Sequence, residues 1–160
     1  MRKIIPILLL TILTMVGCST LDCPLNNTVY TKYKLDGTVT ELTGCTMTVS
    51  TTKRDGEDSI LINKDENVDS FILPMSYANS ADTLYFEGQD RLERVFKDTV
   101  IVAKDNQPHF ESIDCSPSYF HTITGVKTTQ HLIYSIVINH KDVNFDATKT
   151  HFLIYFGTRD

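Results

Sequence analysis

Apolar and polar residues alternate in one short segment of the chain, Val29-Tyr30-Thr31-Lys32-Tyr33-Lys34-Leu35-Asp36-Gly37. A period of two places one row of side chains in a core and the other row in water, as in a half-buried β-strand. The residues at 29, 31, 33 and 35 form the inward row. The pair Asp36-Gly37 that follows suits a tight turn, because both residue types tolerate positive φ. The segment therefore predicts a strand that ends in a turn.

The rest of the chain repeats this pattern in short pieces. Thr, Val, Ile, Tyr and Phe are frequent, and turn-forming residues interrupt them about every 8–12 residues, a spacing typical of all-β sandwiches and barrels. Further strands are predicted over residues 45–50, 59–63, 70–73, 83–86, 92–96, 99–103, 110–113, 119–126, 132–139 and 152–156. Residues 132–139 are apolar on both faces, which predicts a central strand. No segment shows a convincing helical period.

These observations predict an all-β fold, namely an immunoglobulin-like two-sheet β-sandwich. Many short antiparallel strands need two facing sheets to bury their inward rows, and a small β-barrel is the alternative. The chain contains no Trp. The likeness to immunoglobulins is therefore one of layout, without the core Trp of antibody domains.

The first residues have the order of a secretory signal peptide. Arg2 and Lys3 precede an apolar stretch that ends at the small residue Gly17. This stretch is shorter than the roughly 20 residues of a membrane-spanning helix. Cys18, directly after Gly17, resembles the lipobox cysteine of bacterial lipoproteins. The resemblance implies that Cys18 is acylated and becomes the mature N-terminus, and several acyl chains would anchor it permanently to a membrane.

The chain is accordingly predicted to have three parts. Residues 1–17 are the lipoprotein signal peptide, residues 18–27 are the lipidated N-terminus and a tether, and residues 28–160 are one β-sandwich domain. Two of the 15 Lys and Arg residues lie in the signal peptide, so the mature chain has 13 of them against 20 Asp and Glu, a net charge of −7. Such an acidic chain argues against a nucleic-acid partner.

The cysteines predict one disulfide. With Cys18 acylated, three cysteines remain, and in an oxidising envelope compartment two of them are expected to pair. Cys45 shares a predicted strand face with Met47 and is expected in the core, where a free Cys behaves as a small hydrophobe. Cys23 and Cys115 lie in similar turn-like contexts outside the strands. We predict that these two form the disulfide, with two free thiols as the alternative.

Two residue groups are candidates for metal or catalytic sites. Alternating Asn and Asp over residues 63–69 resemble the first ligands of a calcium loop, but Val and Pro stand where that loop needs Gly and Glu, which favours a polar turn. His109 and His121 flank Cys115, an arrangement open to a metal or a Cys/His nucleophile site, but a disulfide would consume the thiol. We predict no enzymatic activity, no metal and no cofactor.

Two surface roles remain open. Three tripeptides resemble the Asp-Ser/Thr-apolar acceptor of O-glycosylation in Bacteroidota, with Ser59, Thr83 and Thr99 as the candidate hydroxyls. The alternative is that Asp before Ser or Thr simply begins a strand. Several tyrosines are candidates for stacking on sugars, although most strand tyrosines are packing residues. They are Tyr30, Tyr77, Tyr85, Tyr119, Tyr134 and Tyr155.

A set of motifs spread over the mature chain resembles a family of uncharacterised small lipoproteins of Bacteroidota. The motifs are Asp22-Cys23-Pro24-Leu25-Asn26-Asn27, Leu73-Pro74-Met75-Ser76-Tyr77, Pro108-His109-Phe110-Glu111-Ser112-Ile113-Asp114-Cys115 and Phe120-His121-Thr122-Ile123. The resemblance implies an envelope location and a small β-domain. It implies no activity and no site residues.

The functional expectation follows from the anchor and the fold. We expect an outer-membrane lipoprotein that acts as a non-enzymatic accessory or interaction module, with an envelope protein or a glycan as partner. The alternative is a surface glycan-binding lipoprotein in polysaccharide uptake. Surface-exported lipoproteins of this phylum typically carry acidic residues soon after the lipidated cysteine, and here only Asp22 does so. This favours the periplasmic side of the membrane.

Overall fold

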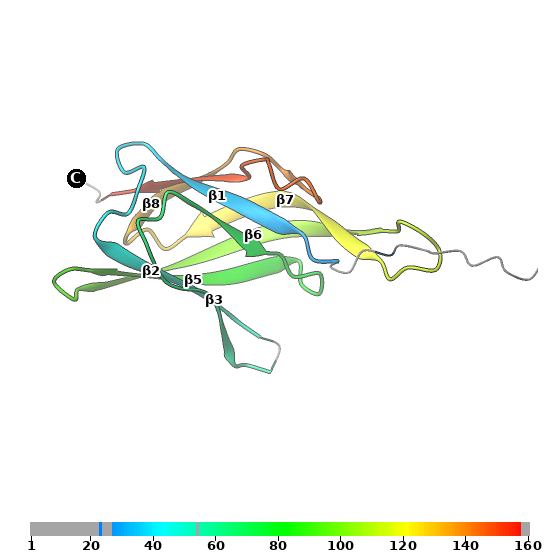
Figure 1. Ribbon diagram of the computed structural model, residues 1–160, viewed down its shortest axis with the longest axis horizontal. Helices are drawn as coiled ribbons and strands as arrows, with labels where there is room; N and C mark the ends of the chain where they lie inside the picture. Colours follow the sequence, from blue (N-terminus) through cyan, green and yellow to red (C-terminus); the bar gives the residue numbers. More distant parts are fainter. Residues whose placement is uncertain (1–22, 24–26, 54, 158–160) are drawn as a thin grey trace, which may run out of the picture.

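The computed structural model describes residues 23, 27–53 and 55–157. The predicted signal peptide and the predicted lipidation site Cys18 lie outside these residues. In the described part the chain forms ten strands in two sheets (Figure 1). None of the described residues belongs to a helix long and apolar enough to cross a membrane.

The smaller sheet has four strands in the order β4-β1-β10-β8. β1 pairs in parallel with β10, and the other two pairings are antiparallel. The strand bounds are β1 (Tyr30–Asp36), β4 (Ser70–Pro74), β8 (Ile133–Ile138) and β10 (Phe152–Phe156).

The larger sheet has six strands in the order β3-β2-β5-β6-β7-β9, and all of its pairings are antiparallel. The strand bounds are β2 (Cys45–Thr52), β3 (Asp58–Glu66), β5 (Ala81–Asp90), β6 (Val95–His109), β7 (Ser118–Thr128) and β9 (Asp142–Val143). Together the two sheets confirm the predicted all-β, two-sheet β-sandwich.

The core lies between the sheets and follows the alternation of the sequence. All four residues of the predicted inward row, from Val29 to Leu35, are at most 2% exposed. Within this row Tyr33 stacks on Phe71 and Phe152, with ring centroids 5.0 and 4.7 Å apart. Gly37 has φ +85°, and a Cβ there would lie 2.8 Å from Cδ1 of Tyr155. The turn after β1 therefore needs glycine for both its conformation and its space.

Several predicted strands differ from the observed ones. Residues 91–94 form a turn, so of the predicted strand 92–96 only residues 95–96 are strand. They belong to β6, which also contains the predicted strand 99–103. Residues 110–113 are a loop, and the two-residue strand β9 was not predicted. The polar segment 63–69 is partly strand, because β3 continues to Glu66 before the chain turns at Asn67 with φ 53°.

Two predictions about burial were also wrong. Residues 132–139 were expected to form a central strand, but β8 is an edge strand on which Tyr134 and Val137 remain about half exposed. Apolar residues on both faces do not by themselves report burial, because much of a protein surface is apolar. Cys45 is free as predicted but only half-buried, because it is the first residue of β2 at the end of the sheet.

Candidate binding pocket

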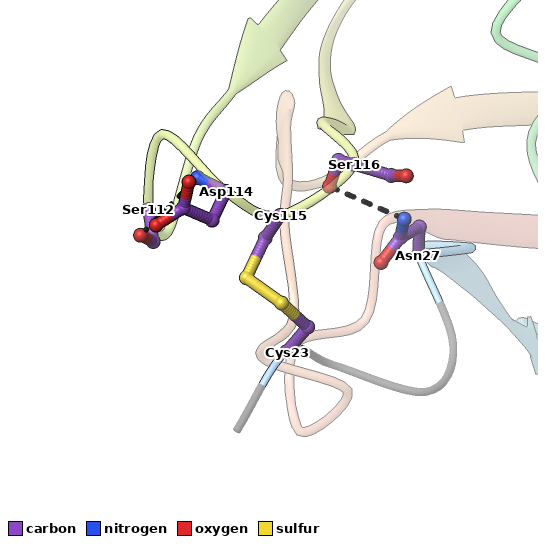
Figure 2. The surroundings of a disulfide bond; sticks show 6 residues. All are labelled: Cys23, Asn27, Ser112, Asp114, Cys115 and Ser116. Atoms are coloured by element: carbon purple, nitrogen blue, oxygen red, sulfur yellow. Dashed lines mark hydrogen bonds between the residues drawn. A yellow bond between two sulfur atoms is a disulfide. The ribbon is translucent and has the colours of Figure 1, made fainter. Parts of the chain in front are cut away.

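A disulfide joins Cys23 to Cys115, as predicted, with their Cα atoms 5.5 Å apart. Cys115 lies in the loop of residues 110–117 that connects β6 to β7. Figure 2 shows the bond together with a hydrogen bond from Nδ2 of Asn27 to the carbonyl oxygen of Ser116, 3.3 Å long. Two contacts thus hold the segment before β1 against the β6–β7 loop.

A cavity of about 340 Å³ opens beside this junction. Its walls come from the segment before β1, from the β4–β5 connection and from the beginning of β7. The lining residues are Asn27, Thr28, Val29, Met75, Tyr77, Pro117, Tyr119 and His121. Its volume is within the range of small-molecule pockets, and we refer to it as the aromatic pocket.

Two tyrosines give the pocket its aromatic character. The rings of Tyr77 and Tyr119 stack with centroids 5.2 Å apart and an interplanar angle of 21°. Tyr77 is 67% exposed although it belongs to this pair. A large aromatic side chain left open to solvent beside a cavity is typical of binding surfaces rather than of packing.

Asn106 on β6 connects the β4–β5 connection, which carries Tyr77, to His121 on β7. Its Nδ2 donates to the carbonyl oxygens of Tyr77 (3.2 Å) and Asn79 (2.9 Å). Its Oδ1 lies 2.7 Å from Nδ1 of His121, which is its partner in the register of β6 and β7. Because the amide NH2 is already used, Oδ1 must accept, and Nδ1 of His121 must carry the proton. Nε2 is then left as a hydrogen-bond acceptor.

His121 is neutral at pH 7. Its burial disfavours the charged imidazolium, and the positive charge of Lys104 adds to this effect. Together they lower the pKa of His121 to about 4. The pocket therefore presents aromatic rings, an amide and an uncharged imidazole, which are groups that bind ligands through stacking and hydrogen bonds.

A buried ion pair joins β5 and β6. Nζ of Lys104 is 2.8 Å from Oδ1 of Asp82, and the two side chains are 0% and 11% exposed. Oδ2 of Asp82 accepts a hydrogen bond from the backbone N–H of Ser76, 3.2 Å away. The pair thus ties β6 and β5 to the connection that carries Tyr77.

The pocket brings together only some of the residues that the sequence singled out. His121, Tyr77 and Tyr119 line it, whereas His109 stacks on Phe120 at 4.2 Å, outside the pocket lining. Cys115 is consumed by the disulfide, so it offers no nucleophile. Among the described residues, no three His, Cys, Asp or Glu side chains gather in a way that could hold a metal ion.

The three candidate glycosylation sites lie away from the pocket lining. Ser59 is on the edge strand β3, whereas Thr83 and Thr99 are on the interior strands β5 and β6. The Asp residues that precede the two threonines are structural, because Asp82 pairs with Lys104 and Asp98 is a buried hydrogen-bond acceptor. Glycosylation of all three residues stays a prediction.

Lys104 and Asn106 were not predicted, although the sequence contained a signal for them. Val100 and Val102 are fully buried and fix the inward phase of β6. Lys104 and Asn106 follow these valines at a spacing of two, so they belong to the same inward row. Two polar residues therefore occupy positions where core residues are expected. A polar residue in an inward row predicts a buried partner, but alternation alone does not identify that partner.

The fold and the pocket together define an all-β protein of two facing sheets with a disulfide-bonded pocket at one end. A model of a family of unknown function, DUF6452, matches residues 46–156. Because this match covers more than half of the chain, the protein belongs to that family. Searches of curated proteins and of solved structures found no match. The predicted resemblance to an uncharacterised family is confirmed at this level.

Proposed function

We propose that this protein is a bacterial envelope lipoprotein, of the Bacteroidota type, anchored to the outer membrane through acylated Cys18. Its β-sandwich acts as a non-enzymatic interaction module on the periplasmic side. The observation that carries the proposal is the Cys23–Cys115 disulfide. Structural disulfides persist in oxidising compartments outside the cytoplasm. This bond also lies five residues after the lipobox cysteine, so it would connect the anchor directly to the fold.

The chemistry of the aromatic pocket supports a binding role. Tyr77 and Tyr119 offer apolar ring faces, and His121 offers an acceptor that stays neutral at pH 7. These groups recognise a partner through stacking and hydrogen bonds. The pocket also adjoins the disulfide, so in the anchored protein it would lie near the membrane.

Radiolabelled palmitate tests the anchor in cells that express the full-length chain. We expect the label on the wild-type protein and its loss in Cys18→Ser, which should also leave the membrane fraction. Cys45→Ser is the matched control, because it removes a thiol that is free in the folded protein. Labelling that persists in Cys18→Ser, or a wild-type protein without label, would contradict the proposal.

Protease treatment of whole cells then decides the side of the membrane. An accessory module on the periplasmic side should be protected in intact cells and degraded after the outer membrane is permeabilised. Release from intact cells would instead place the domain at the cell surface, where the alternative function belongs.

Glycan binding is the second candidate, and the stacking of the exposed Tyr77 on the half-buried Tyr119 favours it. Aromatic faces beside polar groups are well suited to sugar rings. A glycan array followed by calorimetry on the best candidate tests this function. Binding should fall in Tyr77→Ala and stay unchanged in Tyr134→Ala, where the tyrosine is similarly exposed but lies on β8. Equal losses in both variants would contradict a specific site.

A further inference from the structure

Two large apolar side chains project from the loop that carries the disulfide. Ile113 is 97% exposed and Phe110 is 61% exposed, and both lie in the β6–β7 loop of residues 110–117. Ile113 precedes the half-cystine Cys115 by two residues. Exposed Ile and Phe at the tip of a loop need an explanation, because neither contributes to the core of the described chain.

The disulfide places this loop close to the proposed anchor. Cys18 and Cys23 are five residues apart, and five extended residues span at most about 18 Å. Because Cys23 is bonded to Cys115, the β6–β7 loop cannot move further from the acyl chains than this short segment allows. Figure 2 shows Ser112, Asp114 and Cys115 together on this loop, with Cys23 directly beneath Cys115.

The opposite end of the sandwich is out of reach of the anchor. β6 is 15 residues long and therefore spans about 45 Å, with the 110–117 loop at one end and the turn of residues 91–94 at the other (Figure 1). That turn also exposes a large apolar residue, Leu92, which is 73% exposed. The two ends are thus similar in apolar exposure and differ in their distance from Cys23.

We infer that Phe110 and Ile113 insert into the lipid surface to which the chain is anchored, so that the Cys115 end of the sandwich rests on the bilayer. This inference rests on the proposed lipid anchor at Cys18. Insertion of the loop would orient the domain, with β6 leading away from the membrane and the Leu92 turn farthest from it. An acyl chain alone fixes position but leaves the orientation of the domain free.

Charges near the loop tip select the kind of lipid. Glu111 and Asp114 flank Ile113, and His109 lies 3.1 Å from Glu111. Acidic side chains beside the inserting residues are repelled by an anionic lipid surface. We therefore assign a zwitterionic phospholipid surface as the partner.

Tryptophan fluorescence tests the inference directly, because the chain contains no Trp. The lipidated mature protein, which begins at Cys18, is reconstituted into phosphatidylcholine vesicles with and without brominated acyl chains. The variant Ile113→Trp should emit at shorter wavelength on the vesicles, and brominated lipid should quench it several-fold more than Leu92→Trp. Leu92→Trp is the matched control, because it exposes the same indole at the distant end of β6.

The outcomes separate this inference from the proposed function. Failure of the wild-type protein to join the vesicles would contradict the anchor. Stable anchoring with no quenching of Ile113→Trp would leave the anchor intact and overturn the insertion. A blue shift without quenching would indicate a protein contact, such as a second copy, and would also overturn it. In a second variant, Phe110→Trp should lose its quenching when Ile113→Asp is added, because the charge would lift the loop.

Discussion

The ammonium of Lys104 is fully buried, and among the described residues Asp82 alone balances its charge. Nζ makes no hydrogen bond of good geometry within the described residues, so the carboxylate contact must offset most of the cost of burial. We predict that Asp82→Asn lowers the free energy of unfolding by about 3–5 kcal/mol, because it leaves an unpaired charge in the core. Urea unfolding measures this loss.

A double variant provides the control for this prediction. Lys104→Met combined with Asp82→Asn removes both charges while filling the same space, so its stability should lie closer to that of the wild type than to that of Asp82→Asn. If the loss in the double variant equals the sum of the losses in Asp82→Asn and Lys104→Met, the ion pair is not the reason for the loss.

His121 makes the stability of the protein depend on pH. Its pKa is about 4 in the folded state, against about 6.5 in an unfolded chain. Between these values the unfolded state binds the additional proton, so the contribution is complete above pH 6.5 and is lost as the pH falls towards 4. The loss is at most about 3 kcal/mol.

We therefore predict that His121→Gln reduces the slope of unfolding free energy against pH between 6.5 and 4. The slope should not vanish, because burial and the neighbouring His140 also lower the pKa of His151. Urea unfolding at several pH values measures the slope, and an unchanged slope in His121→Gln would contradict the assignment.

Among the secondary-structure elements, β6 and β8 are joined by one carboxylate. Asp98 on β6 is 4% exposed and accepts hydrogen bonds from the backbone N–H groups of Leu132 (2.6 Å) and Ile133 (2.8 Å). It also accepts from the N–H of His131 and the hydroxyl of Thr129. Burial alone would raise the pKa of Asp98, but these donors outweigh it and hold that pKa below its usual range. One residue of the larger sheet thus fixes the start of a strand in the smaller one.

We predict that Asp98→Ala lowers the free energy of unfolding by about 3 kcal/mol or more, because it leaves several buried N–H groups without an acceptor. Hydrogen exchange should show faster exchange at the amides of Leu132 and Ile133 than at those of β2, which does not contact Asp98. Since the folded pKa of Asp98 is depressed, its contribution is present above about pH 4 and is lost only below that value. Equal exchange of β8 and β2 amides would contradict this role.

The same elements show which parts of the fold the sequence could predict. Local alternation correctly placed β1, β2 and the inward row of the core, because the pleat determines which side chains share a face. It failed at Lys97-Asp98, which it left between two predicted strands. The strand β6 continues through both residues because distant amides satisfy Asp98. Pro108 lies inside β6. It is tolerated there because this part of β6 extends beyond β5 and pairs with β7 on one side only.

The candidate site was predictable only in its components. The disulfide followed from the two cysteines that lie outside strands, and Tyr77, Tyr119 and His121 were each singled out. Their convergence depends on Asn106, whose three hydrogen bonds join segments up to 29 residues away from it. Such contacts are set by the packing of the whole chain, and single-sequence periodicity carries no information about them.

In the molecule as a whole, the disulfide closes a covalent loop with a sequence separation of 92 residues. The chain-entropy model assigns about 4–5 kcal/mol to a loop of this length, and measured values for native disulfides are about 2–5 kcal/mol. We predict a loss in this range for the double variant Cys23→Ser/Cys115→Ser, measured by urea unfolding.

Cys45→Ser should change stability little, because that thiol is free and half-buried. A reductant should lower the wild type to the stability of the double variant and leave the variant itself unaffected. If it lowers both equally, the stabilisation does not come from this bond, and the link between the segment at Cys23 and the β6–β7 loop loses its energetic basis.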